Sequence, residues 1–339
     1  MLRGFYIMLS ATFITACSGH KQIESDIQTY TDRLKSFTEI PLPESEITNI
    51  SALESFKAPK KSALRIDIPE LSINLREFYA FSDCALNQVI AQRNTSLGKM
   101  QLPAARYAYE TNLLQEFDRC ITILKQDLEE NQNLVSKLDE WSSTKQTHLP
   151  LAYANLITQS DEIYAHFFRA NDFISGNEDD NFPIIKQAFR FLVKANENIT
   201  VDIGELEYHL QQLNISPLMA RKWRTQAFLT NELDRASVLL NTYYETNTCA
   251  SKKQEEDIMI MRNIFTKLFA DNIQPVAAEL NKYHYQLSPL IETLIKQQSL
   301  PDSFVEYVNF QQTTAYNNYA ESMRQHIKIW QNIFARCDK

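Results

Sequence analysis

One cysteine near the start of the chain has the surroundings that lipid attachment requires. Residues 1–16 carry Arg3 and then an apolar run, and no acidic residue occurs before Glu24. A positive leader, a short apolar run and small residues at the cleavage point are typical of an export signal. The letters ITAC at 14–17 fit the bacterial lipobox, in which a diacylglycerol joins the cysteine sulfur and the new amino terminus is acylated. The sequence therefore predicts a signal peptide over 1–16 and lipidation of Cys17, with palmitate among the attached acyl groups.

The alternative is an ordinary signal peptide in which Cys17 falls at this place by chance. The apolar run is shorter than the roughly 20 residues of a transmembrane helix, whereas several acyl chains on one residue give stable anchoring. Ser18 follows, not the Asp that tends to retain Gram-negative lipoproteins in the inner membrane. We therefore expect an outer-membrane anchor that faces the periplasm, with 17–22 as a short tether to one helical domain over 23–339.

A second group of side chains that could carry function is charged or polar. It lies in the stretch QRNTSLGKMQLPAARYAYE, residues 92–110. In the simpler interpretation the stretch only joins two helices, with Asn94 ending the first and Gly98 supplying a positive φ. The alternative is a recognition surface, because fixed polar loops on a rigid scaffold often carry function. The residues of that candidate surface are Arg93, Asn94, Ser96, Lys99, Arg106 and Tyr107.

Signatures of catalysis and of metal binding are weak. The sequence contains no G-x-S-x-G or H-E-x-x-H motif and no glycine-rich phosphate loop. Glu162 and His166 stand four residues apart, which places them on one helical face in a spacing that metal sites use. The apolar residues around them favour a packed helix instead, and we interpret Glu207 with His209, and also His284, as exposed or core-edge groups. No catalytic residue, metal ligand or cofactor is predicted.

The stretch MARKWR, residues 219–224, places cations around an aromatic ring. It could contact lipid headgroups or a glycan. We favour a core position for Trp223, with Arg221, Lys222 and Arg224 directed into solvent near acidic neighbours. The chain has 15 tyrosines, and at helical spacing we expect most of them at the edge of the core, with their hydroxyls in water.

Four cysteines follow the lipobox, at positions 84, 120, 249 and 337. An even number in an oxidising compartment predicts two disulfides, for which three connectivities exist. The sequence does not choose among them. We favour Cys84–Cys120 and Cys249–Cys337, because each bond would join neighbouring helices. No C-x-x-C motif points to a redox or zinc site.

Composition limits the fold and the class of partner. Only five glycines occur in 339 residues, whereas a sheet protein of this size needs many for its turns and bulges. The formal net charge of −8 disfavours nucleic acid, whose phosphates require clustered Lys and Arg. The sequence therefore predicts an all-α fold, an elongated bundle of about eight or nine helices, with no nucleic-acid partner.

Apolar periodicity and proline positions place the helices along the chain. Residues 41–68 lose the periodicity and predict a long crossing loop, with a short turn at 50–56. Prolines 69, 103, 183 and 217 are predicted to begin helices, and 93–103, 143–150 and 175–181 are predicted breaks. The last helix carries one long apolar stripe and is expected to pack centrally. The predicted helices cover 23–37, 69–92, 103–141, 150–173, 183–213, 217–245, 253–297 with interruptions near Pro275 and Pro289, and 305–334.

The lipobox, a helical chain of this length, the stretch AQRNTSLGK and the following P…RY.YE together resemble a family of Gram-negative lipoproteins known only as a domain of unknown function. The resemblance covers essentially the whole mature chain. It implies an envelope lipoprotein, and it brings no activity, cofactor or catalytic residue with it.

The functional expectation is a lipoprotein that binds or scaffolds another envelope protein without catalysis. One alternative is a periplasmic hydrolase that acts on glycan or lipid, which needs a cleft with buried carboxylates or a His–carboxylate pair. The other is a periplasmic chaperone or lipid carrier, which needs an apolar groove between helices.

Overall fold

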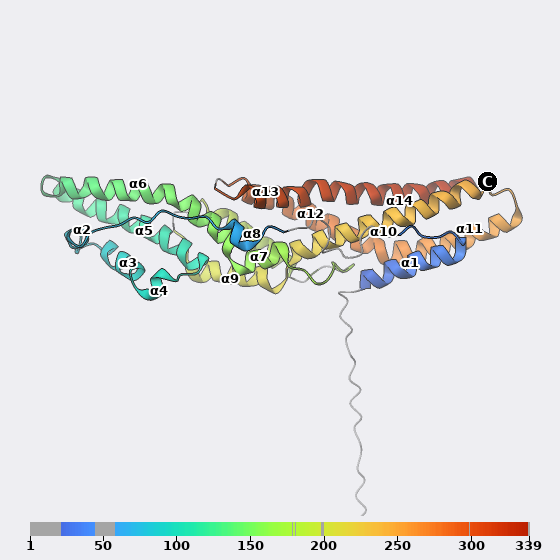
Figure 1. Ribbon diagram of the computed structural model, residues 1–339, viewed down its shortest axis with the longest axis horizontal. Coiled ribbons are helices and arrows are strands. Elements are labelled where there is room, and N and C mark those ends of the chain that lie inside the picture. Colours follow the sequence, from blue (N-terminus) through green and yellow to red (C-terminus); the bar gives the residue numbers. More distant parts are fainter. Residues whose placement is uncertain are drawn as a thin grey trace, which may run out of the picture.

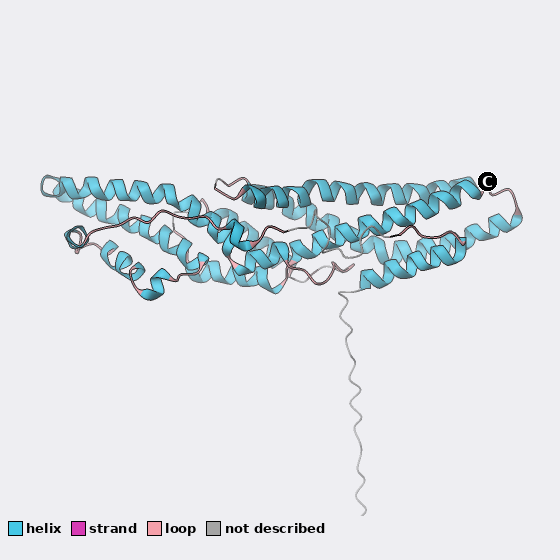
Figure 2. Cartoon of the chain, in the orientation of Figure 1, coloured by secondary structure: helices cyan, strands magenta, loops and turns pink. Residues whose placement is uncertain are grey.

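The computed structural model describes residues 22–44, 58–177, 179, 181–197, 200–297 and 299–337. Across these ranges the chain is helical and contains no strand (Figure 2), so the predicted all-α class is confirmed. The helices form an elongated body (Figure 1). The predicted turn at 50–56 lies outside the described residues.

The helices in chain order are α1 (Gln22–Thr38), α2 (Leu75–Ala80), α3 (Leu86–Arg93), α4 (Ser96–Lys99), α5 (Pro103–Leu124), α6 (Leu128–Gln159), α7 (Asp161–Phe168), α8 (Phe182–Ala195), α9 (Ile203–Ile215), α10 (Leu218–Thr246), α11 (Lys252–Ile264), α12 (Gln274–Ile295), α13 (Asp302–Asn309) and α14 (Ala315–Cys337).

Prolines mark some of the helix starts as expected. Pro103 occupies the first turn of α5, and Pro217 immediately precedes α10, where a missing N–H costs nothing. Pro69 does not begin a helix, and this prediction is wrong. The chain stays extended until Asn74, whose side chain accepts from the Glu77 N–H while the Glu77 carboxylate accepts from the Asn74 N–H. This capping box fixes the start of α2.

The helix predicted over 103–141 is in fact two. A short 3₁₀ turn, Lys125–Asp127, reverses the chain after α5, and α6 packs back along α5 (Figure 1). The break predicted at 143–150 is absent, because α6 continues through Pro150. An interior proline costs roughly 3 kcal/mol. Ala152, Leu156 and Ile157 beyond it are at most 1 % exposed, and burial of such side chains offsets that cost.

Several other boundaries differ from the expectation. The helix predicted over 150–173 bends at Ser160 and ends at Phe168. The one predicted over 183–213 is split into α8 and α9, and Asp202 caps the second by accepting from the Glu205 N–H. Near Pro275 the chain forms a π-helix, Phe265–Ile273, and Pro289 causes no interruption. A second π-helix, Phe310–Thr314, separates α13 from α14.

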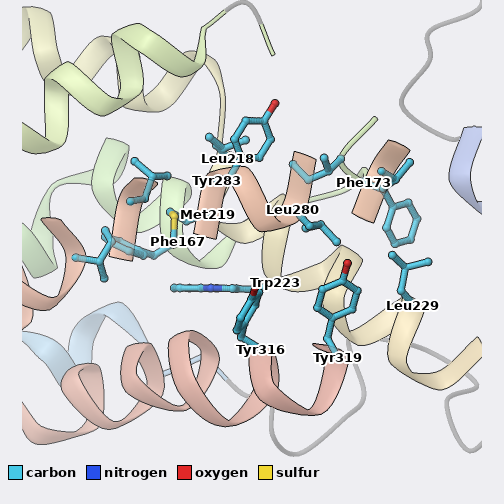
Figure 3. Close-up of a cluster of buried hydrophobic side chains, with 14 of the residues drawn as sticks. Phe167, Phe173, Leu218, Met219, Trp223, Leu229, Leu280, Tyr283, Tyr316 and Tyr319 are labelled. Atoms are coloured by element: carbon cyan, nitrogen blue, oxygen red, sulfur yellow. The ribbon is translucent and has the colours of Figure 1, made fainter. Parts of the chain in front are cut away.

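Two hydrophobic clusters fill the body. The larger joins α1 and α7–α14, and α14 packs along α10 (Figure 1). Figure 3 shows Trp223 within this cluster, near Phe167 and Tyr316, and the Phe167 ring stacks on it with centroids 5.7 Å apart. The smaller cluster lies between α2, α3, α5 and α6. Because α5 and α6 contribute residues to both clusters, this helix pair joins the two halves.

Buried tyrosines complete the ends of helices. The hydroxyl of Tyr107 donates to the Ala195 carbonyl, and that of Tyr153 to the Leu192 carbonyl, each over 2.8 Å. Both carbonyls lie in the last turn of α8, where no intrahelical N–H is available. The expectation that tyrosine hydroxyls remain in water is therefore wrong for these side chains, which are at most 1 % exposed.

Two disulfides join the cysteine pairs favoured above. The Cα atoms of Cys84 and Cys120 lie 5.4 Å apart, and those of Cys249 and Cys337 lie 5.5 Å apart. The first bond ties the start of α3 to α5, and the second ties the end of α14 to the loop after α10. Of the described helices, none is both long enough and apolar enough to cross a bilayer.

Candidate functional site

The stretch after α3 folds back on itself through close backbone packing. Thr95 Oγ1 donates to the Gln92 carbonyl and accepts from the Gly98 N–H. A Cβ atom at Gly98 would lie 2.3 Å from the Gln92 carbonyl oxygen, so only glycine fits there. The predicted positive φ at Gly98 is wrong, since no described glycine has one; the close approach of the short helix α4 to α3 explains the residue instead.

The structure brings three of the six predicted surface residues, Arg93, Asn94 and Arg106, to one site. Arg93 at the end of α3 and Arg106 in the first turn of α5 line the same two adjoining cavities, and Asn94 lines one of them. Ser96 is exposed and lines neither. Tyr107 is fully buried, so its place on a surface is ruled out. The side chain of Lys99 lies outside the described part of the chain.

The cavities have volumes of about 620 Å³ and about 920 Å³. The smaller lies between the extended segment 70–74, α2, α3, α5 and α6, and Lys145 of α6 also lines it. We call the smaller cavity, with Arg93, Arg106 and Lys145, the cationic cleft. Sequence reasoning missed Lys145, because the stretch around it was interpreted as a break between helices.

The charges of the cationic cleft do not cancel. Glu110 is 1 % exposed and forms ion pairs with Arg106 and with Lys145, the latter over 3.2 Å. Arg93 makes no ion pair with a described residue, and its Nη1 donates to the Gly98 carbonyl. The three cations and the two carboxylates, those of Glu110 and the exposed Glu70, sum to one positive charge. The protein as a whole has a net charge of −8.

Burial acts on these cations. It lowers the pKa of Lys145, while Glu110 opposes the shift. Burial also lowers the pKa of Arg93, and the positive charge of Arg106 lowers it further. Burial and the nearness of the other cations both disfavour the charged forms of Lys145 and Arg93, and an anion between them would relieve the repulsion.

Apolar side chains form the rest of the cationic cleft. Ile90, Leu113 and Phe117 belong to the smaller hydrophobic cluster and also line the cavity. Leu75, which also lines the cavity, is 70 % exposed. Met100, which lies between Arg93 and Arg106 in the sequence, is 82 % exposed. The further apolar lining residues are Leu71, Ile73 and Phe78.

The histidine and carboxylate pairs form no comparable site. His166 is fully buried, with Nδ1 2.8 Å from the Leu213 carbonyl, and burial lowers its pKa to about 4. Glu162 faces the larger cavity. His209 stacks on Phe191 at 4.5 Å. Within the described ranges no group of three or more His, Cys, Asp or Glu residues could hold a metal ion.

The larger cavity carries several carboxylates, none of which is buried. Asp67, Asp161 and Glu207 are exposed, and Glu162 is half-buried. No histidine lines either cavity. The arrangement therefore provides charge and shape for binding, and the buried carboxylate beside the cationic cleft, Glu110, is held in ion pairs with Arg106 and Lys145.

The prediction for MARKWR is half right. Trp223 is in the core, but Arg221 and Lys222 are 6 % and 0 % exposed instead of lying in solvent. Arg221 forms ion pairs with Asp172 at 3.1 Å and with Asp179 at 2.9 Å. The first turns of α10 are buried on nearly every side, from Leu218 to Gln226, so Arg221 and Lys222 cannot reach water.

The proposed lipidation residue, Cys17, lies outside the described residues. No curated protein and no solved structure matches the chain. A family model, described as "Protein of unknown function (DUF3080)", matches residues 27–339. The match covers well over half of the chain, and the protein therefore belongs to this family of unknown function.

Proposed function

We propose that this protein is a lipid-anchored component of the bacterial envelope that binds another envelope component without catalysis. The export signal and the lipobox at Cys17 support the anchor. The Ser at position 18 supports the outer membrane as its location. The cationic cleft is the binding site in this proposal.

One observation carries the assignment of the binding site. Arg93, Arg106 and Lys145 come from three helices and converge on one concave surface. Side chains of Lys and Arg are normally exposed, and withdrawing them from water costs free energy unless they gain a partner. Arg93 gains no carboxylate from the described residues, so a bound anionic group would provide the compensation.

Photocrosslinking from the cleft in intact cells tests the proposal. A photoreactive residue at Ser72, which is exposed and lines the cationic cleft, is compared with one at Met259 on α11, which is 63 % exposed and lies far from it. We expect a discrete adduct from Ser72 and none from Met259, and weaker labelling when Arg93→Gln and Arg106→Gln are added. Identical labelling from both positions, or none from Ser72, would contradict the proposed site.

A further inference from the structure

We propose that the cationic cleft binds a single-chain amphiphile whose head is anionic. The head, a phosphate or carboxylate, lies between Arg93, Arg106 and Lys145, and the apolar chain lies against the wall that continues into the smaller hydrophobic cluster. This inference rests on the proposed function and names the chemical class of what the cleft binds.

The head is assigned from the unused donors of the two guanidinium groups. Arg93 uses Nη1 for the Gly98 carbonyl, and Arg106 uses Nη2 for Glu110. Their remaining N–H groups donate to no described residue. Guanidinium forks match the geometry of carboxylate and phosphate oxygens. Lys145 adds a third cation, 7 % exposed, whose contact with Glu110 at 3.2 Å leaves further N–H donors.

The chain is assigned from the apolar lining of the same cavity. Ile90, Leu113 and Phe117 present apolar surface to the cavity from α3 and α5. Two of the most exposed large apolar side chains of the described residues, Leu75 and Leu102, each line one of the two adjoining cavities and are 70 % and 73 % exposed. An apolar chain that leaves the cavity would cover such side chains and remove them from water.

The size of the site agrees with a small ligand. A cavity of about 620 Å³ falls within the roughly 300–1,000 Å³ typical of small-molecule sites. The acyl groups proposed for Cys17 are not the occupant, because they carry no anionic head. Helix α1, which follows the tether, packs on α10, α11 and the π-helix before α12, in the other half of the molecule (Figure 1).

Calorimetric titration of the full mature chain tests the inference with three probes. Dodecyl phosphate carries chain and head, inorganic phosphate carries the head alone, and dodecyl maltoside carries the chain with a neutral head. All are used below their micelle concentrations. We expect dodecyl phosphate to bind at least about tenfold more tightly than either of the other two, since hydrogen bonds to charged groups and buried methylenes both contribute.

Matched variants assign the binding to the cleft. Arg93→Gln removes one cation without breaking an ion pair, and Ser72→Glu adds a negative charge to the lining. Each is expected to weaken dodecyl phosphate binding by at least about tenfold. Arg76→Gln, on the exposed face of α2 and outside the cavity lining, is the control and should leave it unchanged. Circular dichroism checks that every variant is folded.

Each outcome decides one point. Equal affinity for dodecyl phosphate and dodecyl maltoside would show that the head is not recognised, and equal affinity for inorganic phosphate would show that the chain is not. Either result, or unchanged binding in both Arg93→Gln and Ser72→Glu, overturns the inference. If Ser72 still crosslinks a protein in cells after such a result, the proposed function survives and only the ligand class falls.

Discussion

Lys222 is the most unusual single residue of the core. It is 0 % exposed, its Nζ donates to Gln312 Oε1 over 3.1 Å, and it lies 3.4 Å from Nδ1 of His284. The Tyr316 ring centroid is 5.7 Å away. It makes no ion pair with a described carboxylate. Burial lowers the pKa of Lys222 to about 7 from an ordinary value of 10.5, because the charged form is poorly solvated there.

This shift predicts a pH dependence of stability. Between about pH 7 and about pH 10.5 the unfolded chain keeps a proton that folded Lys222 releases, so the free energy of unfolding rises with pH in this window. Lys222→Met should remove that contribution, which reaches about 1.4 kcal/mol per pH unit. Urea unfolding of both proteins over this range measures the difference.

The exposed Lys328 on α14 supplies the control, Lys328→Met, which should retain the pH dependence of the native protein. Parallel pH curves for Lys222→Met and the native protein would contradict the assignment of the buried amine.

Single residues show where sequence reasoning succeeds. The core position of Trp223 could be predicted, since a large apolar ring favours burial. The cysteine pairing was only favoured among three connectivities, and the fold decides it by placing the paired Cα atoms 5.4 Å and 5.5 Å apart. The burial of Lys222 and Tyr107 could not be predicted, because it depends on which helices cover α10 and α5. Lys145 was missed because the stretch around it was interpreted as a break between helices, and its neighbours at the cleft come from α3 and α5.

At the scale of elements, the Cys84–Cys120 disulfide holds α3 in place. Helix α3 has eight residues, too few to be stable alone, and it carries Arg93 into the cleft. Cys84→Ala with Cys120→Ala should therefore weaken dodecyl phosphate binding and lower the free energy of unfolding by about 2–4 kcal/mol. Titration and urea unfolding measure the two effects.

The second disulfide is the matched control. It closes a separation of 88 residues instead of 36, so Cys249→Ala with Cys337→Ala should destabilise by about 0.8 kcal/mol more in the chain-entropy account. Since it lies away from the cleft, it should leave dodecyl phosphate affinity intact. If the two double variants lost affinity equally, the local role of α3 would be refuted.

Helix boundaries were predicted where local chemistry determines them. Pro103 and Pro217 mark starts, and the end of helical structure before α8 was recognised from the polar residues there. The reversal at Lys125–Asp127 and the passage of α6 through Pro150 escaped prediction, because tertiary packing decides both. The π-helix at Phe310–Thr314 was not predicted either. A π-helix adds one residue to a helical turn, and this leaves no clear trace in the spacing of apolar residues.

For the whole molecule, the all-α class followed from the scarcity of glycine and from apolar periodicity. The cationic cleft could be predicted only in part. Its two arginines lie in one stretch, whereas Glu70 and Lys145 come from distant segments that the fold brings together. The division of the core into two hydrophobic clusters joined by α5 and α6 likewise could not be predicted, because it depends on the reversal of the chain at Lys125–Asp127.

The anchor belongs to this scale, and Cys17→Ser tests it. We expect the native protein in the membrane fraction and the variant in the soluble periplasmic fraction, because the sulfur that would carry the lipid is gone. Mass spectrometry of the amino terminus shows the acyl groups directly. Ser18→Asp is the companion variant: it should keep the acyl mass and move the protein to the inner membrane. Unaltered fractionation of Cys17→Ser would refute the anchor.

The extended chain after the 3₁₀ turn Lys61–Leu64 is bonded to α6 in an unusual way. Asn155 accepts from the Ile66 N–H and donates to the Ile66 carbonyl, and Thr158 donates to the Leu64 carbonyl. Extended segments with open backbone groups are templates on which a second molecule can add a strand. Here Asn155 of α6 occupies both backbone groups of Ile66, so this residue is protected from the intermolecular pairing that begins aggregation.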